Sequence, residues 1–144
     1  MARAQPRADL IVLAPDLPDL RLVVEIKTRI DALDLEAATK QVQSYMQGTN
    51  CPLGLIVTPT RSWLLRDEYE ADGSISRTEY PTAMLLGVSD VPAEEDELEL
   101  LVGRWLESLT SGSSTGLRDE VRFDVSRYLI PALVEGRVES GRFG

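Results

Sequence analysis

The sequence contains no histidine and one cysteine, and these two scarcities exclude several kinds of functional site. Without histidine there is no imidazole for general acid–base catalysis and no ligand for a His-rich zinc site. A single cysteine, Cys51, excludes an internal disulfide and is typical of a chain in a reducing compartment. We therefore expect a cytoplasmic protein whose chemistry uses other side chains.

The chain also lacks a long uncharged apolar run, so the sequence predicts no membrane-spanning helix. Its first ten residues, MARAQPRADL, have no apolar signal-peptide core. We find no internal repeat and no glycine-rich loop of the kind that cradles phosphate. With 144 residues, 43% of them hydrophobic and 27% charged, the chain is long enough for one globular domain with a substantial core.

Basic residues are scarce relative to acidic ones, 15 against 24, and the net charge of −9 is unfavourable for nucleic-acid binding. The imbalance lies in the second half, because residues 1–66 carry eight Lys/Arg and seven Asp/Glu, whereas residues 67–144 carry seven and seventeen. The basic side chains of the first part form either a phosphate-contacting rim or ordinary solvated charges. They are Arg3, Arg7, Arg21, Lys27, Arg29, Lys40, Arg61 and Arg66.

Two apolar runs near the N-terminus, Leu10–Ala14 and Leu20–Ile26, flank a segment rich in proline and aspartate, Pro15–Asp19. Proline restricts φ and aspartate bonds its own backbone, so this segment predicts the turn of a β-hairpin. Folding the chain about Leu17 places residue i opposite residue 34−i, as follows from the spacing.

This register places Asp9 opposite Glu25, with Lys27 two residues further along the same strand face. Two carboxylates that lie close together share a proton or hold a cation, and a divalent ion with oxygen ligands, Mg²⁺ or Mn²⁺, suits such a pair. The alternative is a solvated strand end at Asp9 and an ordinary surface pair at Glu25 and Lys27. Against it, Glu25 interrupts an apolar run and should lie in a cleft.

A helix is predicted after an acidic connection at residues 30–34, with Asp34 as its cap, Leu35 as its first residue and Gly48 as its end. Gln41 and Tyr45 are four residues apart and share a face of it. Tyr45 is either a core residue with Gln41 at the boundary, or both belong to a site. The buried stripe is predicted to comprise Leu35, Ala38, Val42, Tyr45 and Met46.

Further β-structure is expected in the middle of the chain. Residues 51–58 and 63–66 predict two strands, and the turn signal Asp72-Gly73 indicates that residues 75–80 pair back as an edge strand. Residues 82–88 are short and apolar, and the pattern does not distinguish helix from strand.

The C-terminal part predicts two helices at residues 93–109 and 119–135, joined by a flexible linker at residues 110–116. Asp90 or Pro92 should open the first helix, Pro131 should kink the second and Gly136 should end it, with a frayed tail beyond. Their stripes comprise Leu98, Leu101, Val102, Trp105, Leu106 and Leu109, and Val121, Val125, Tyr128, Leu129 and Leu133. These helices either pack on the sheet or pair two subunits, and the wide stripe favours a homodimer.

The order Asp9, then Glu25-Ile26-Lys27 on the next strand, then Gln41 and Tyr45 on the following helix resembles the PD-(D/E)XK nuclease superfamily. The segment Gln41–Tyr45 is similar to the QxxxY motif of its RecB-type exonuclease branch. The resemblance covers roughly residues 7–67. It implies a restriction-endonuclease-like α/β fold, a mixed central sheet flanked by helices, formed by residues 1–88, with residues 89–144 as an added helical extension of one compact domain.

The resemblance also implies a reaction, hydrolysis of a phosphodiester, most simply in DNA, by a water activated at an Asp/Glu/Lys site. Asp9, Glu25 and the Ile26 carbonyl would hold Mg²⁺ or Mn²⁺, and Lys27 would offset charge growing in the transition state. Gln41 would orient a phosphate or the attacking water with support from Tyr45. Residues Thr58, Pro59 and Arg61 would lie near the mouth of the site.

One departure from the family pattern concerns the start of the chain, since members normally carry a helix and a strand before the Asp-bearing strand. Eight residues precede Asp9 here. We expect a trimmed fold, a partner chain that completes it, or a natural protein that begins earlier. Two other functions stay open, namely an inactive nuclease-like module that binds DNA or protein, and an acidic interaction protein that acts through residues 93–144.

Overall fold

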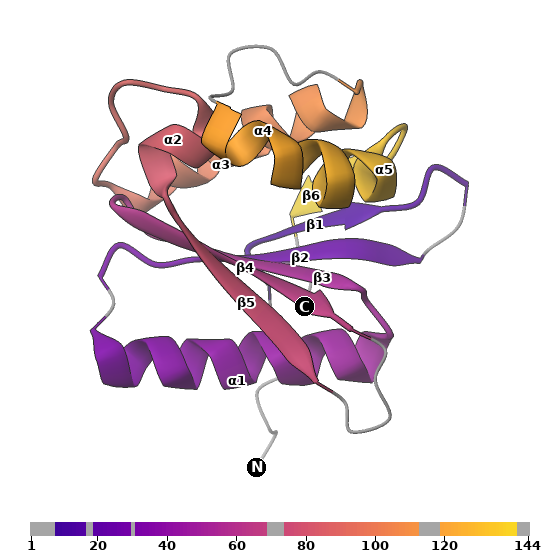
Figure 1. The fold of residues 1–144 in the computed structure, drawn as a ribbon, viewed down its shortest axis with the longest axis horizontal. Coiled ribbons are helices and arrows are strands. Elements are labelled where there is room, and N and C mark those ends of the chain that lie inside the picture. The colour runs from indigo at the N-terminus through magenta and orange to yellow at the C-terminus, as the bar shows by residue number, and fades with distance from the viewer. Residues whose placement is uncertain (1–7, 17–18, 30, 69–73, 113–118, 141–144) are drawn as a thin grey trace.

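The computed structural model describes residues 8–16, 19–29, 31–68, 74–112 and 119–140, and these form a mixed α/β structure (Figure 1). The described strands make one six-stranded sheet in the order β5-β4-β3-β2-β1-β6. The strands are β1 (Leu10–Leu13), β2 (Leu20–Ile26), β3 (Leu53–Val57), β4 (Arg61–Asp67), β5 (Ile75–Pro81) and β6 (Arg137–Ser140). The helices are α1 (Ala32–Thr49), α2 (Thr82–Leu86), α3 (Glu95–Thr110), α4 (Asp119–Asp124), the π-helical turn η1 (Val125–Leu129) and α5 (Ile130–Leu133).

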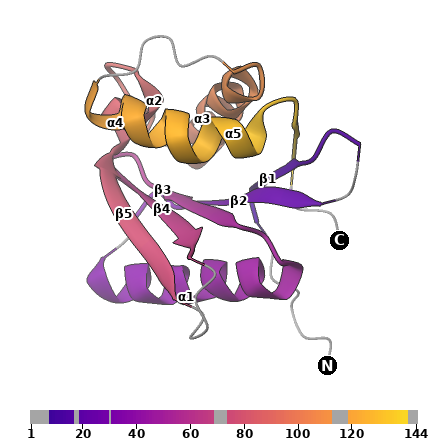
Figure 2. The same cartoon turned by 45° about the vertical axis from the view of Figure 1, so that its right-hand side comes forward.

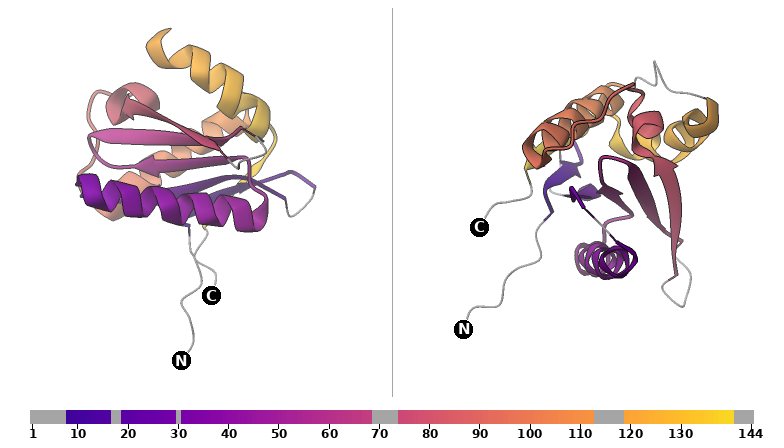
Figure 3. Two further views of the ribbon diagram at one scale, coloured as in Figure 1. Left: turned by 60° about the horizontal axis from the view of Figure 1, so that its bottom comes forward. Right: turned by 90° about the vertical axis from the view of Figure 1, so that its left-hand side faces the viewer.

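Helix α1 connects the central strands β2 and β3, which pair in parallel, while the other neighbouring strands in the described sheet pair antiparallel. The views in Figures 2 and 3 show α1 on one face of the sheet and α2, α3, α4 and α5 on the other. Two buried clusters fill these layers. We call them the α1-side cluster and the α3-side cluster, after the principal helix of each.

The hairpin register expected from the sequence is correct over three pairs, in which Leu10, Ile11 and Val12 lie opposite Val24, Val23 and Leu22. The register then shifts between Val12 and Leu13, so that Leu13 pairs with Leu20. This irregularity lies at the turn end of the hairpin. At the other end the pairing begins at Leu10, and the Asp9 N–H donates to the carbonyl of Val24, the partner of Leu10, so the strand pairing does not extend to the expected pair of Asp9 and Glu25.

The predicted ends of α1 are wrong by a few residues. Asp31 rather than Asp34 caps the helix, because the Asp31 Oδ1 accepts a bond from the Asp34 backbone N–H at 2.8 Å. The helix continues through Gly48 to Thr49, and Asn50, with φ of 57°, forms the left-handed C-cap. The predicted buried stripe is confirmed, with Ala38, Val42 and Met46 buried and Leu35 and Tyr45 packed against the α1-side cluster.

The middle of the chain forms the expected strands, and the undecided segment after β5 is the helix α2. Asp72 and Gly73, the predicted turn, lie outside the described residues. Gly54 in β3 explains how closely α1 lies on the sheet, because a Cβ there would be 2.6 Å from Val42 Cγ1 and 2.8 Å from Met46 Sδ. Glycine is therefore needed at this contact.

The predicted helix at residues 93–109 is α3, which begins two residues later than expected after the cap position Glu94, rather than at Asp90 or Pro92. Its predicted stripe is confirmed, and Leu98, Val102 and Leu106 are fully buried. Of the expected linker at residues 110–116, Thr110 is the last residue of α3 and Ser111 is its C-cap, while residues 113–116 lie outside the described residues.

The second C-terminal helix is interrupted near Pro131, as expected. The π-helical turn η1 ends at Leu129, directly before α5, which contains this proline. The prediction of a frayed tail is wrong for residues 137–140, which form β6 and pair with β1. Gly136 precedes this strand, and a Cβ there would be 2.9 Å from the carbonyl oxygens of Leu13 and Leu133. None of the helices in the described part of the chain combines the length and hydropathy that a bilayer-spanning segment requires.

Candidate functional site

Glu25 and Lys27 lie on the α1 side of β2 and form an ion pair, with 3.6 Å between Lys27 Nζ and Glu25 Oε1. Their neighbours in β2, Val24 and Ile26, are buried on the opposite side. Only 14% of the Glu25 side chain is exposed, against 41% for Lys27. The carboxylate therefore lies in a partly closed environment, as the apolar run around it predicts, and the ammonium faces solvent.

Asp9 lies directly before β1, beside the backbone of β2. Its Oδ2 accepts a bond from the Ile26 N–H at 2.7 Å, and its own N–H donates to the Val24 carbonyl at 2.8 Å. Lys27 N–H donates to Val57 in β3, so by strand alternation the N–H and the carbonyl of Ile26 both point the other way, toward β1. The Asp9 carboxylate and the Ile26 carbonyl are thus on the same side of β2.

Gln41 and Tyr45 of α1 line one small cavity together with Glu25. Its volume is about 10 Å³, close to what one water molecule needs, and its other walls are Ala8, Val23, Val24 and Val42. Gln41 is exposed and Tyr45 is half-buried. The parallel β2–α1–β3 connection is what places a helix, and so these two side chains, over the carboxylate.

Tyr45 contributes to packing as well as to this cavity, since it contacts the α1-side cluster. Burial raises the pKa of its hydroxyl, with a smaller contribution from the nearby Cys51. The phenol therefore stays protonated at neutral pH and can act as a hydrogen-bond donor there. Tyr45 therefore both packs against the cluster and lines the cavity.

The oxygens available here are of the chemical type that a hard divalent cation such as Mg²⁺ prefers. Mg²⁺ commonly keeps several waters and binds proteins through one or two carboxylates, and Asp9, Glu25 and the Ile26 carbonyl offer two carboxylates and one backbone oxygen. Among the described residues no group of three or more His, Cys, Asp or Glu side chains is arranged to hold a metal. A cation here would therefore depend on backbone and water oxygens for its other ligands.

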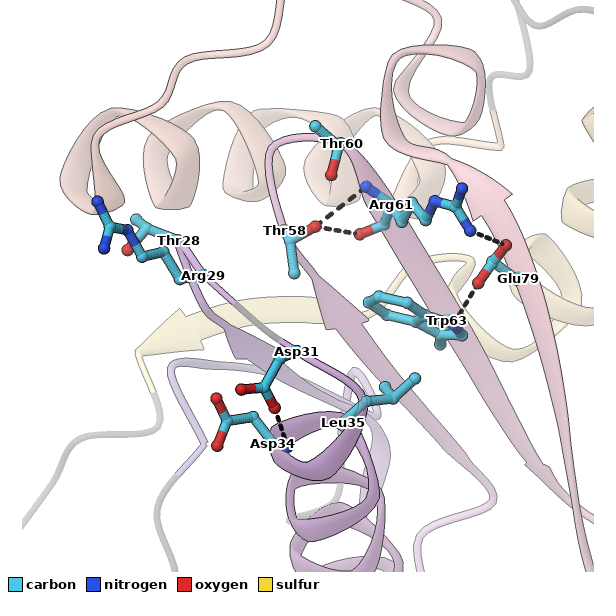
Figure 4. A pocket seen from close by; sticks show the side chains of 10 residues that line it. All are labelled: Thr28, Arg29, Asp31, Asp34, Leu35, Thr58, Thr60, Arg61, Trp63 and Glu79. Atoms are coloured by element: carbon cyan, nitrogen blue, oxygen red, sulfur yellow. Dashed lines mark hydrogen bonds and ion pairs between the residues drawn. The ribbon is translucent and has the colours of Figure 1, made fainter.

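A larger hollow of about 730 Å³ begins at Thr28 and Arg29, directly after Lys27, and is bounded on the other side by β4 and β5 (Figure 4). The sequence predicted Thr58, Pro59 and Arg61 near the mouth of the site, and Thr58 and Arg61 do line this hollow. The remaining lining residues are Asp31, Asp34, Leu35, Thr60, Trp63 and Glu79. Two arginines and three acids make its lining mixed in charge.

Glu79 organises one wall of the hollow. One of its oxygens accepts from the Trp63 indole N–H at 2.9 Å and the other from Arg61 Nη1 at 2.9 Å (Figure 4). The sequence analysis did not single out Trp63 or Glu79 as site residues. They are direct partners in the β4–β5 pairing. Folding the chain about the turn signal Asp72-Gly73 would have placed Trp63 opposite Thr82 instead, so the sequence signal does not give this pair.

Cys51 is excluded as a nucleophile by its surroundings. The thiol is buried in the α1-side cluster and donates to the Leu53 carbonyl, with 3.3 Å between Sγ and the oxygen. Burial raises the pKa of the thiol to about 11, so almost no thiolate forms at neutral pH.

Comparison with models of known protein families, with curated proteins and with solved structures finds no match to this chain. The arrangement of Asp9, Glu25, Lys27, Gln41 and Tyr45 is therefore interpreted from its own geometry.

Proposed function

We propose that the chain is a metal-dependent phosphodiesterase of the restriction-endonuclease-like PD-(D/E)XK type that cleaves nucleic acid, most simply DNA. The observation that carries the proposal is the meeting of three elements at one place. Asp9 bonds the backbone of the Glu25-Ile26-Lys27 segment, and α1 brings Gln41 and Tyr45 over Glu25.

Asp9, Glu25 and the Ile26 carbonyl would hold the cation, Mg²⁺ or Mn²⁺. When bound, the ion would supply Lewis-acid polarisation of a phosphoryl oxygen and a lower pKa for the attacking water. The low exposure of Glu25 suits this role, because a partly buried carboxylate is screened less by solvent than one on an open surface.

Lys27 is the cationic residue best placed to act on the phosphate. Its ammonium is partly exposed beside Glu25, so it can stay paired in the free protein and contact a phosphate when substrate arrives. There it would offset the negative charge that grows in the transition state. The Gln41 amide can orient the attacking water or a phosphate oxygen, and Tyr45 supports that position from the core side.

Arg29 provides a second positive charge two residues after Lys27, exposed at the edge of the large hollow. Asp31 and Asp34 line the same side of this hollow as Arg29, with Arg61 across from them (Figure 4). We expect the phosphate backbone to contact Lys27 and Arg29 and to avoid these two carboxylates.

The test is a cleavage assay on labelled single- and double-stranded DNA with Mg²⁺ and with Mn²⁺, using wild type, Lys27→Ala and Lys40→Ala. Lys40 is an exposed lysine on α1 and controls for loss of one positive charge. We expect Lys27→Ala to reduce the rate roughly 10²–10³-fold and Lys40→Ala to change it little. No cleavage by the wild type with either ion, or equal rates for wild type and Lys27→Ala, would contradict the proposal.

One observation favours the second candidate, an inactive nuclease-like module that binds DNA or a protein. The described residues contain no third acidic side chain grouped with Asp9 and Glu25. Calorimetric titration with Mg²⁺ or Mn²⁺ separates the two candidates, because an active centre should give heat that Glu25→Ala removes. An inactive module should give no such heat.

A further inference from the structure

Strand β6 ends the sheet on the side of β1, and no described strand pairs with its outer edge. We propose that two copies of the chain form a two-fold symmetric dimer across this edge, through β6 and the adjoining face of α3. The proposal is independent of the proposed reaction, because it concerns a different side of the molecule, the β6 edge that α3 overlies (Figure 3).

The direction of the β6 backbone groups follows from the neighbouring strands. Val24 and Ile26 direct their backbone groups toward β1, so Leu10, the partner of Val24, faces β2 and Ile11 faces β6. Ile11 lies opposite Glu139, so Glu139 bonds β1. By alternation Val138 therefore presents its N–H and carbonyl to the open edge.

The charges on β6 select one register for pairing with a second copy. Antiparallel pairing of Val138 with Val138 of the second copy would place Arg137 opposite its Glu139, and Glu139 opposite its Arg137. The next register would place the two Glu139 side chains opposite each other, which is unfavourable. Within one copy Arg137 and Glu139 already attract each other, with 3.2 Å between Nη1 and Oε2.

The adjoining face of α3 has the same self-complementary pattern. A groove of about 520 Å³ runs between α3 and β6, and Leu100, one of its lining residues, is 57% exposed. Asp96 and Arg104 lie one turn before and one turn after Leu100 and also line the groove. When two such helices meet antiparallel at Leu100, each Asp96 faces the other copy's Arg104.

Gly103, in the middle of α3, favours a close approach of a second copy's α3 at this face. A glycine in a helix interior is destabilising relative to alanine. No packing contact in the described part of the chain requires it, because a Cβ at Gly103 would there meet only Leu10 Cδ1, at 4.0 Å. In the dimer Gly103 would lie beside Leu100, and because it has no side chain the two α3 helices could approach closely.

The opposite edge of the sheet is unsuited to the same use. Strand β5 ends at Pro81, which has no N–H to donate, and its Arg77 is bonded to Glu36 and Thr39 of α1. These features are typical of an edge that is protected against pairing, whereas β6 carries charges that match a second copy of itself.

The first experiment measures the mass of the full chain by sedimentation equilibrium over a wide range of concentration. We expect wild type to be a dimer. Leu100→Glu should raise the dissociation constant at least roughly tenfold, because the new carboxylate would be buried against the same carboxylate of the second copy. Phe123→Glu is the matched control, because Phe123 is 63% exposed on α4, outside the groove, and should leave the mass unchanged. A wild-type chain that is monomeric throughout would overturn the proposal.

The second experiment tests the register by charge exchange. Arg137→Glu and Glu139→Arg should each weaken the dimer roughly tenfold, because each places like charges opposite one another, and the double variant should restore it. Val138→Pro should also abolish dimerisation while keeping the β1–β6 pairing, since it removes an N–H that faces outward. Circular dichroism verifies that each variant is folded. A dimer that neither single charge variant weakens would overturn the proposed register.

Discussion

The two faces of the sheet are built differently. Among the described residues, twenty-one buried residues from five helical segments and the strands form a continuous apolar cluster on the α3 side. The described cluster on the α1 side has nine buried residues, to which a single helix contributes, and the candidate polar residues lie at the edge of this layer. The comparison indicates that the α3 side supplies most of the stability, while the thinner α1 side leaves room for Glu25 to reach solvent.

Polar groups on the α3 side illustrate the contrast, because they hold elements together. Tyr80 donates a hydrogen bond to Asp124 of α4, and the Arg66 guanidinium stacks on the Tyr128 ring at 3.8 Å from its centre. Burial raises the pKa of the Tyr80 hydroxyl, and the bond to Asp124 raises it further. These contacts tie α4 and η1 to the sheet.

The largest effect on stability should come from a truncation on the α3 side. Leu106 is fully buried in α3, and Leu106→Ala should lower the free energy of unfolding by about 2–5 kcal/mol. The DNA cleavage rate measured where the variant is still folded should be unchanged, because Leu106 belongs to the cluster on the opposite face of the sheet from α1. Denaturant unfolding and the cleavage assay together test this, and a large loss of activity in the folded variant would break the division between the faces.

A smaller loss of stability with a larger effect on the site should follow from Gly54→Ala. The added methyl would overlap Val42 and Met46 and push α1 away from β3, which should cost about 1–3 kcal/mol. Because Gln41 and Tyr45 move with α1, the cleavage rate of the folded variant should also fall. The measurement is the same pair of assays, and unchanged activity would show that the spacing of α1 is not critical.

The smallest effect concerns pH and Cys51, whose pKa is raised to about 11 by burial. A raised folded-state pKa stabilises the protein below the unfolded value, about 9.0, and this contribution is lost as pH rises through about 11. Between pH 8 and 10 wild type should therefore lose about 1 kcal/mol more than Cys51→Ala. Urea unfolding at both pH values measures the difference, and parallel pH dependence in the two proteins would contradict it.

Local patterns predicted much of this fold. The stripes of α1 and α3 and the register of the first hairpin follow from spacing alone, because helices and strands have fixed periods. Helix ends were less predictable, since Asp31 and Asp34 are both suitable caps and only the backbone path selects Asp31. The polar tail at residues 137–140 has no strong strand pattern, and it is a strand because β1 offers it an edge.

The candidate site divides in the same way. The sequence by itself determined that Glu25 and Lys27 share a strand face and that Gln41 and Tyr45 share a helix face, since each pair is close along the chain. Only the tertiary structure decided that α1 lies over Glu25 and that β6 is the last described strand of the sheet. These relations join residues far apart in sequence, and packing of the whole chain, not local periodicity, sets them.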